Sequence, residues 1–485
     1  MPPPPGGGGR GPFEGRLAVL LAALAVGLLV IGGGVYVASG GDRQRTGKPV
    51  AETAATPSGS PSVDRGDGRG AGGDTPAYDH NAGIGAGESP VWLRENRTDL
   101  ARKGAEQYGP WRVGGVVVKA MYKEVVAYAV ADGREMWKAA LETRLCSVPH
   151  APSVSGKLVV GVLESDTAEG DCTGLQQIDL ATGRAGWRIR VPREYTDDTG
   201  RFQMAVVGET VAITRRLGMI GFSVTDGRRL FGTSTTGACF PVSLAGGAKL
   251  IYLVECLGPK GGTGLSATRV QELDPATGRA KWTHQYADGW RVGQVYSVDP
   301  LVVSVRRAKV WNITAFTPDG GIRSQIAPEF PVSDHCDALA SYDVQGCYGA
   351  VTDAETLYIA GGKTDGAGHV TYAVVAVDLD TGTEKWRAAG PDGRTMWPLA
   401  VENGKLVVYL ATRPGTAGAV AVLAPTGGAP QTVLRSPAAA VGAERGFEPS
   451  RARLAWAGGR IFLLKDRVFS PRPRAVDHSI LSFGK

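Results

Sequence analysis

The sequence predicts an all-β protein, a β-propeller of four-stranded blades behind an N-terminal transmembrane helix. A short phrase recurs along the chain: an apolar run, then Asp or Thr next to Gly, then a large aromatic residue four positions later. The glycines of this phrase stand at positions 133, 183, 227, 278, 320, 382 and 427, so successive copies lie 42 to 62 residues apart. Periods of about 40–50 residues with several short strands each are typical of propeller blades.

Each part of the phrase has a physical reason. Five copies are strong, and they pair Gly133 with Trp137, Gly183 with Trp187, Gly227 with Phe231, Gly278 with Trp282 and Gly382 with Trp386. Glycine supplies the positive φ of a tight hairpin turn, and the bulky aromatic residue fills the gap between diverging blades. We assign these residues structural roles and expect Trp187, Trp282 and Trp386 to be largely buried. Ordinary hairpins in a β-sandwich are the alternative, which the near-regular period disfavours.

Two copies resemble a known repeat. Leu273–Trp282 and Val377–Trp386 are similar to the PQQ-like, or quinoprotein-type, β-propeller repeat, whose pattern is roughly hAhDhxTGxxxW. The resemblance covers roughly residues 89–485 and implies a membrane-anchored bacterial protein of that type. Relatives with this repeat include quinone-dependent alcohol and glucose dehydrogenases, an outer-membrane assembly lipoprotein, and sensor domains of membrane kinases that hold no quinone. The resemblance therefore specifies the fold and leaves the activity open.

The strand segments favour eight blades, with seven as the alternative. Third strands are expected near Val125, Leu175, Met219, Arg269, Trp311, Tyr372, Ala419 and Ser479. The last set, Arg453 to Gly484, ends without an outer strand, which would leave an unpaired edge. An isolated strand-like piece, Ser89 to Arg94, follows the linker. We predict that this piece is the missing outer strand, where Pro90 is tolerated because an outermost strand bonds on one edge only.

Four regions precede or form this ring. Residues 1–16 are a short cytoplasmic tail, 17–37 a transmembrane helix, 38–88 a disordered Gly/Ala/Pro/Ser linker, and 89–485 the propeller. Leu17–Val37 is uncharged and long enough to span a bilayer, whereas a cleaved signal peptide, the alternative, usually has an apolar region of only about 7–15 residues. The expected location is the cell membrane, single-pass, with the C-terminal domain outside the cytoplasm.

Six cysteines favour an oxidising compartment. Each of the pairs Cys146/Cys172, Cys239/Cys256 and Cys336/Cys347 falls within the sequence of one blade, and an even number of cysteines in an exported chain indicates disulfides. Six cysteines allow 15 pairings, of which local pairing is the simplest. Buried free thiols are the alternative.

The chemistry of the chain is less specific. The resemblance implies that a quinone enzyme would carry an acidic base, a calcium site and often an adjacent-cysteine disulfide, yet the sequence has no Cys-Cys pair. We therefore expect no cofactor, PQQ included, and assign no catalytic, cofactor-binding or metal-ligating residues. Asp334-His335-Cys336-Asp337 has metal-ligand residue types, but Cys347 is its one candidate partner at ligand spacing, and a disulfide loop is favoured there.

Two classes of function stay open. The first is a membrane-tethered, extracytoplasmic propeller that acts as a binding or scaffold module for a protein or envelope ligand, and is not an enzyme. The alternative is a quinone- or metal-dependent oxidoreductase. A net charge of +6 from 53 basic and 47 acidic residues is too mild to indicate nucleic-acid binding. The expected partners are thus the membrane, through one helix, and a protein or envelope ligand.

Overall fold

The structure is a computed structural model that describes residues 78–485, apart from 168–169, 193–200, 236–238, 259–264, 288, 333–342, 365–369 and 472–476. The predicted tail, the transmembrane span and the linker up to residue 77 lie outside this part of the chain. In the part that is described, no helix is both long and apolar enough to cross a membrane.

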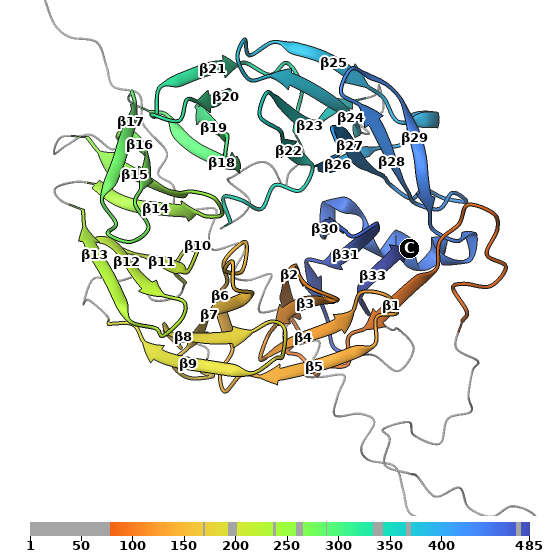
Figure 1. Ribbon diagram of the computed structural model, residues 1–485, viewed down its shortest axis with the longest axis horizontal. Helices are drawn as coiled ribbons and strands as arrows, with labels where there is room; N and C mark the ends of the chain where they lie inside the picture. Colours follow the sequence, from red (N-terminus) through yellow and green to blue (C-terminus); the bar gives the residue numbers. More distant parts are fainter. Residues whose placement is uncertain are drawn as a thin grey trace, which may run out of the picture. The chain divides into compact units, whose positions relative to one another are not determined.

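The described residues form eight antiparallel sheets arranged in a ring, which confirms the eight-bladed propeller (Figure 1). From inner to outer strand, blades 1 to 4 are β2 (Ala105–Val113), β3 (Val116–Met121), β4 (Glu124–Ala129), β5 (Glu135–Ala140); β6 (Leu145–Ser147), β7 (Lys157–Leu163), β8 (Cys172–Asp179), β9 (Ala185–Arg190); β10 (Met204–Val207), β11 (Thr210–Arg215), β12 (Gly218–Ser223), β13 (Arg229–Ser234); and β14 (Cys239–Ala245), β15 (Leu250–Leu257), β16 (Leu265–Leu273), β17 (Ala280–Tyr286). Blades 5 to 8 are β18 (Arg291–Val298), β19 (Leu301–Arg307), β20 (Val310–Phe316), β21 (Ile322–Ile326); β22 (Ala350–Thr352), β23 (Thr356–Thr364), β24 (Val370–Asp378), β25 (Glu384–Ala388); β26 (Met396–Glu402), β27 (Lys405–Leu410), β28 (Ala419–Ala424), β29 (Gly427–Arg435); and β30 (Ala452–Ala457), β31 (Arg460–Lys465), β33 (His478–Gly484), β1 (Val91–Glu95).

The eighth blade is closed by the N-terminal strand, as the sequence predicted. Strand β1 runs antiparallel to β33, with Val91 opposite Phe483 and Leu93 opposite Leu481. The side chain of Asn81 hydrogen-bonds both the backbone N–H (2.8 Å) and the carbonyl oxygen (2.9 Å) of Val91. We call this sheet the closing blade, because it joins the two ends of the domain without a covalent bond.

Two features of the closing region were not predicted. The short strand β32 (Arg467–Val468) leaves the closing blade and adds a fifth strand to blade 1, pairing with Ala105 and Glu106 of β2. Short helical turns are η2 (Pro391–Gly393), η3 (Ala438–Ala440), α2 (Val441–Glu444), η4 (Arg445–Phe447) and η5 (Pro449–Arg451). The last four connect blade 7 to the closing blade.

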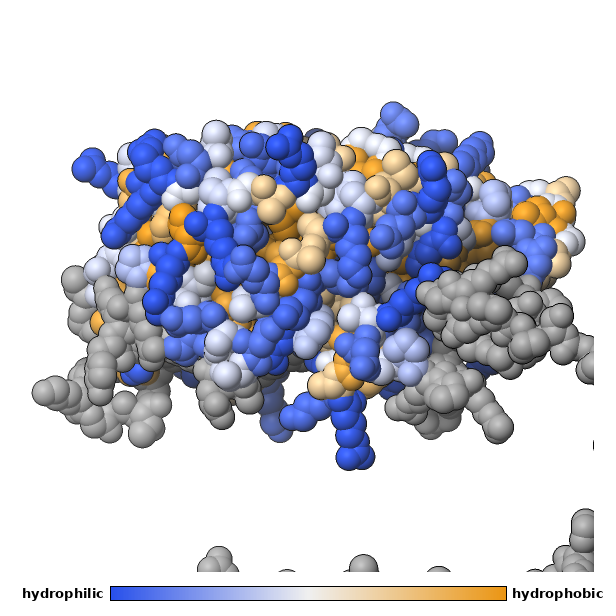
Figure 2. All heavy atoms as spheres, turned by 90° about the horizontal axis from the view of Figure 1, so that it is seen from below, coloured by the Kyte–Doolittle hydropathy of each residue, from blue (hydrophilic) through white to orange (hydrophobic). Residues whose placement is uncertain are grey.

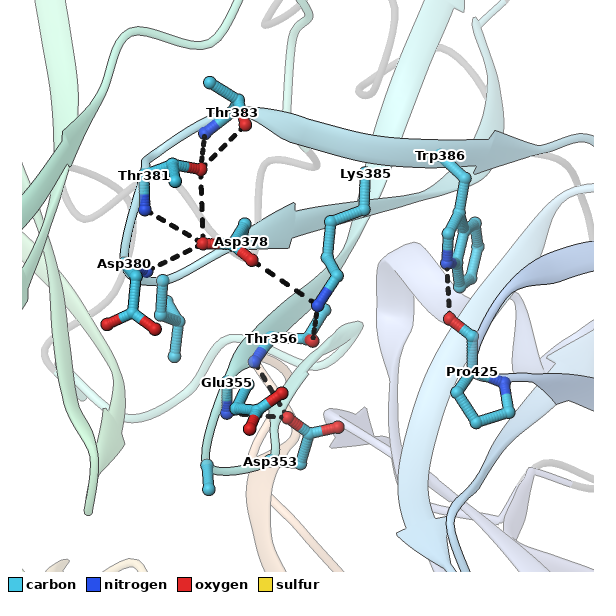
Figure 3. A network of polar contacts seen from close by, with 12 residues as sticks. Asp353, Glu355, Thr356, Asp378, Asp380, Thr381, Thr383, Lys385, Trp386 and Pro425 are labelled. Carbon is cyan, nitrogen blue, oxygen red and sulfur yellow. Dashed lines mark hydrogen bonds and ion pairs between the residues drawn. The ribbon is translucent and has the colours of Figure 1, made fainter.

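The recurring turn is stabilised by its own side chains, as Figure 3 shows for blade 6. The Oδ1 atom of Asp378 accepts hydrogen bonds from the backbone N–H groups of Asp380 and Thr381, both at 2.9 Å, and from the Thr381 hydroxyl at 3.1 Å. The backbone hydrogen bond from Thr381 is the main reason that the pKa of Asp378 lies below its ordinary value. Asp179 and Asp274 bind their own turns in the same way, so the Asp-x-x-Thr-Gly motif is a turn with a built-in carboxylate cap.

The aromatic residue of the phrase packs over the turn glycine of the next blade, a contact that we call the clasp. The Trp137 ring lies over Gly183, where an added Cβ would stand 2.6 Å from ring atoms, and Trp386 covers Gly427 in the same way at 2.8 Å. The Trp386 indole N–H also donates to the carbonyl of Pro425 at 2.7 Å (Figure 3). Glycine is therefore required at these turns for two reasons, its positive φ and the absence of a side chain under the ring.

This clasp accounts for the burial of the repeat tryptophans. Trp137, Trp187, Trp282 and Trp386 are mostly buried, as predicted, although less completely than core residues, because one ring face covers a glycine at the outer edge of the ring. Gly382 is the exception among the predicted glycines: the preceding blade has Ser324 at the aromatic position, and its hydroxyl donates to the Leu379 carbonyl at 2.7 Å.

Two of the three predicted disulfides are present. Cys239 and Cys256 are direct partners across β14 and β15. Cys146 and Cys172 are also bonded, although they lie on the first and third strands of blade 2 rather than on neighbouring strands. Cys336 lies outside the described residues, so its pairing with Cys347 stays a prediction.

The antiparallel order gives the ring two distinct faces. The face that we call the turn face carries the recurring turns and the links between first and second strands. The opposite connector face carries the links between second and third strands and those between blades. Viewed edge-on, the ring is flat and its rim is mostly hydrophilic, with small apolar patches (Figure 2). The hydrophobic core lies between adjacent sheets, as in the seam that buries Val159, Leu175 and Ile213.

Candidate functional site

A cavity of about 330 Å³ lies where the innermost strands converge on the axis of the ring. Most of the residues around it belong to innermost strands or to segments next to them, and Asp466 and Arg467 follow the second strand of the closing blade. They are Glu106, Tyr108, Cys146, Ser147, Val148, Arg201, Phe202, Gln203, Met204, Leu244, Asp343, Gly346, Tyr348, Arg453, Asp466 and Arg467. The segment before β22 reaches across the ring, because the side chain of Gln345 hydrogen-bonds both backbone groups of Gly246 in blade 4.

Glu106 of β2 is one centre of the cavity. Its carboxylate accepts hydrogen bonds from the Tyr108 hydroxyl (2.9 Å), Arg201 (3.1 Å) and Arg467 (2.9 Å). Burial pushes the pKa of Glu106 upward, but Arg201, Tyr108 and Arg467 outweigh it and hold the pKa below its ordinary value. Burial and the Glu106 charge raise the pKa of Tyr108 to about 12. At neutral pH the pair is therefore an ionised carboxylate bound by a neutral phenol.

Arg453 of β30 is the second centre. Its guanidinium lies 5.6 Å from the ring centroid of Tyr108 and 5.8 Å from that of Tyr348. It donates a hydrogen bond to the Tyr348 hydroxyl at 3.0 Å and forms an ion pair with Asp466 at 3.3 Å. Burial favours the neutral form, but Tyr348, Asp343 and Asp466 outweigh burial and raise the pKa of Arg453 above its ordinary value. The cation is thus held by aromatic faces and carboxylates together.

These contacts leave the cavity electrostatically balanced. Arg201 and Arg467 bind Glu106, and Arg453 binds Asp466. An anionic quinone would have to compete with these carboxylates for the same arginines, so the lining residues do not fit such a cofactor. Among the described residues, no group of three or more His, Cys, Asp or Glu is placed to hold a metal ion. The arrangement is better suited to fixing the inner strands than to binding a charged small molecule.

The residues singled out in the sequence are distributed elsewhere. Of the disulfide cysteines, Cys146 lines the axial cavity, and Cys239 borders a separate pocket near blade 4. The repeat tryptophans and glycines lie at the outer edge of the ring, away from the axis. The Asp334–Asp337 cluster lies outside the described residues.

Sequence reasoning missed the axial cluster. Its members are more than 350 residues apart at the extremes, and no local motif connects Glu106, Arg201 and Arg453. The available signal is positional: charged or aromatic residues occur near the start of inner strands, where the ring brings them to the axis.

The connector face carries exposed apolar side chains on three successive blades. Leu217, Leu257 and Val310 are 41%, 49% and 57% exposed. Leu217 lies in the link between the second and third strands of blade 3, Leu257 is the last residue of β15 in blade 4, and Val310 is the first residue of β20 in blade 5, so all three lie at the connector-face end of their blades.

Comparisons with known proteins bear on the family. A family model described as "Outer membrane protein assembly factor BamB" matches residues 86–238. The propeller carries PQQ-like repeats. No curated protein matches the sequence significantly.

Solved structures that are similar to this chain include three with TM-scores below 0.5. BamB from Moraxella catarrhalis is 15% identical, with a TM-score of 0.41, over 80% of this chain and 98% of that one. A europium-containing methanol dehydrogenase is 11% identical, with a TM-score of 0.46, over 81% and 93% of the two chains. A quinohaemoprotein alcohol dehydrogenase from Comamonas testosteroni is 12% identical, with a TM-score of 0.45, over 82% and 76%.

Proposed function

We propose that this protein is a membrane-tethered, extracytoplasmic scaffold whose propeller binds a protein partner through its connector face. The observation that carries the proposal is the set of exposed apolar side chains Leu217, Leu257 and Val310 at the connector-face ends of three neighbouring blades. Their burial by a partner would be favourable at about 25 cal/mol per Å² of apolar surface. The rigid ring would fix the spacing between these contacts.

Two further observations support a binding role over catalysis. The axial cavity is filled with paired charges, so we expect it to hold no quinone. The family model that matches residues 86–238 is described as an assembly factor of the outer membrane. A role in assembly is consistent with the binding function that we propose here.

The location belongs to the same proposal. Disulfides persist in oxidising compartments, and two are present in blades 2 and 4. The apolar segment 17–37 would anchor the chain, and the part of the linker before residue 78 would give the ring a reach of about 35 Å. Protease added to intact protoplasts should then remove the propeller. A protected propeller would contradict the proposed topology.

Site-specific photocrosslinking tests the binding face. A photoreactive residue at Leu257 in the full chain, expressed in its native envelope, should yield a discrete protein adduct. The same residue at Val154, which is 83% exposed in a first-to-second-strand link on the turn face, is the matched control. The variant Leu217→Glu/Val310→Glu should reduce the Leu257 adduct. Equal labelling from Leu257 and Val154 would contradict the proposed face.

The oxidoreductase alternative has its own test. The full chain purified with added quinone and calcium should show no stoichiometric chromophore. A tightly bound chromophore, together with dye reduction by an alcohol, would favour the enzyme instead.

A further inference from the structure

A groove of about 480 Å³ lies in the seam between the closing blade and blade 1. One wall is the segment from Leu93 to Thr98, which begins in β1 and continues beyond it. The other wall is the sheet of blade 1, with Lys119 on β3, Val126 and Tyr128 on β4, and Lys138 on β5. The groove is therefore built from both ends of the domain, and it exists only when the ring is closed.

Lys119 is an unusual residue for its position. In the sheet register, the residue four positions before the turn glycine pairs with a residue of the second strand. Lys119 stands three positions after that paired residue in blade 1. The same position holds Val160, Ile213, Tyr252 and Ile359 in blades 2, 3, 4 and 6, and all four are buried. Lys119 is only 3% exposed, so blade 1 buries an amine where these blades bury apolar side chains. Burying a charge is costly unless it is compensated.

The protein compensates this amine only in part. Among the described residues, the Lys119 Nζ atom has one hydrogen bond, to Oε1 of Gln107 at 2.7 Å. An ammonium group has three N–H donors. Gln107 is itself fixed, because its Nε2 atom donates to the carbonyls of Lys465 (3.0 Å) and Ser479 (3.1 Å) in the closing blade. The amine is thus held in place with donors left for another acceptor.

The groove as a whole is positive. Five basic side chains line it, Arg94, Arg97, Lys119, Arg134 and Lys138, against the three acidic side chains Glu95, Glu124 and Glu135. Glu124 is already engaged by an ion pair with Lys138 and a hydrogen bond from the Thr98 hydroxyl at 3.0 Å. Burial lowers the pKa of Lys119 to about 8, with smaller effects from Glu124 and Lys138, so the amine is still mainly protonated at neutral pH.

We propose that this groove binds a small anionic group, a carboxylate or a phosphate, with Lys119 at its base and Arg97 and Lys138 at its rim. The anion would accept the unused Lys119 donors and balance the excess positive charge. Because it would contact β1 on one side and blade 1 on the other, binding would also stabilise the closed ring. This site shares no residue with the axial cavity or with the exposed apolar set Leu217, Leu257 and Val310.

Protection of one lysine tests the proposal. In the purified full chain, inorganic phosphate or acetate should slow acylation of Lys119 by an amine-reactive ester, saturably and by roughly tenfold, as peptide mass spectrometry can measure. The melting temperature should rise over the same concentration range. Tighter binding of phosphate would assign a phosphate ligand, and tighter binding of acetate a carboxylate.

Two variants separate a binding role from a structural one. Lys119→Met keeps the volume, makes the position resemble the other blades, and should weaken anion binding by at least roughly tenfold while remaining folded. Lys123→Met removes a nearby, half-exposed lysine that pairs with Asp166 outside the groove, and it should bind as the wild type does. If neither anion protects Lys119, or if Lys119→Met binds with unchanged affinity, the proposal is wrong.

Discussion

Blade 6 and the closing blade have the same strand order but different chain connections. Blade 6 takes its four strands, β22 to β25, from one continuous stretch of sequence, whereas the closing blade takes β1 from the opposite end of the domain. Both use the same tryptophan clasp: Trp386 covers Gly427 of blade 7, and Trp92 covers Gly133 of blade 1. A blade can therefore be completed by a strand from a distant part of the sequence, when that strand carries its own tryptophan over the turn glycine of the next blade.

The closing strand shares the indole hydrogen bond of blade 6 and adds other contacts. Trp92 is 7% exposed, and Trp386 is less completely buried. The Trp92 indole N–H donates to the Val130 carbonyl at 2.9 Å, as that of Trp386 does to the Pro425 carbonyl, and Arg94 also donates to the Gly133 carbonyl. Asn81 pairs with the free edge of β1 as a neighbouring strand would. These contacts offset the entropy of ordering an otherwise free chain end.

Truncation should have the largest effect on this comparison. Removing residues 1–77 leaves every described contact of β1 in place, so the protein should stay soluble and melt as the full propeller does. Removing residues 1–100 deletes β1, exposes the edge of β33, and should give an unstable or aggregating protein. Thermal melts and size-exclusion chromatography would measure the difference. Similar melting of the two truncations would contradict the closure.

Removing the clasp should cost less than removing the strand. Trp92→Ala should lower the free energy of unfolding by about 3–5 kcal/mol, the usual range for a buried tryptophan. Trp386→Ala should lower it by less, because Trp386 is less completely buried than Trp92. Urea denaturation of both variants provides the comparison. An equal cost at both sites would show that the closing strand has no special dependence on its clasp.

The glycine beneath the clasp should show a smaller but specific effect. Gly133 and Gly208 both have positive φ, at +70° and +57°, but only at Gly133 would an added Cβ meet a side chain, 2.5 Å from the Trp92 ring. Gly133→Ala should therefore destabilise the protein more than Gly208→Ala by about 1–3 kcal/mol, the usual cost of overpacking. Chemical denaturation would measure both, and equal losses would mean that backbone strain alone explains the glycine.

The seam should also respond to pH through Lys119. Because burial lowers its folded pKa to about 8 from 10.5, the unfolded chain binds more protons between these values, and the wild type gains stability as pH rises through this window. Glu124, Glu135 and Lys138 face this amine from the same sheet, and Arg94 and Arg97 from the opposite wall.

The matched variant isolates this effect. Relative to Lys119→Met, the wild type should gain about 1 kcal/mol between about pH 7 and about pH 9. Denaturation curves at both pH values would measure the gain. A difference that does not change with pH would show that Lys119 is not an ionised group buried in the seam.

The sequence predicted the parts of the fold that depend on the repeated turn phrase and on the outer strand missing from the last set. The turn phrase recurs, so the propeller fold and the structural role of Gly133 followed from its spacing. The strand segments favoured eight blades over seven, and the missing outer strand of the last set pointed to the piece Ser89 to Arg94, which contains most of β1. The axial cluster could not be predicted, because Glu106, Arg453 and their partners come together only when the ring closes. The clasp was half predicted: the aromatic residue was expected between blades, but its contact with the next glycine needs coordinates.

Cross-linking β1 to β33 tests the central claim most directly. In the register of the closing blade, Leu93 faces Leu481, whereas Leu463 lies one strand further in, opposite Leu481 on β31. Directly paired strand residues are close enough for a disulfide. The double variant Leu93→Cys/Leu481→Cys should therefore form a new disulfide in the folded full chain, found by non-reducing peptide mapping, and Leu93→Cys/Leu463→Cys should not. A chain that forms neither link, or both equally, would contradict closure of the ring by its N-terminal strand.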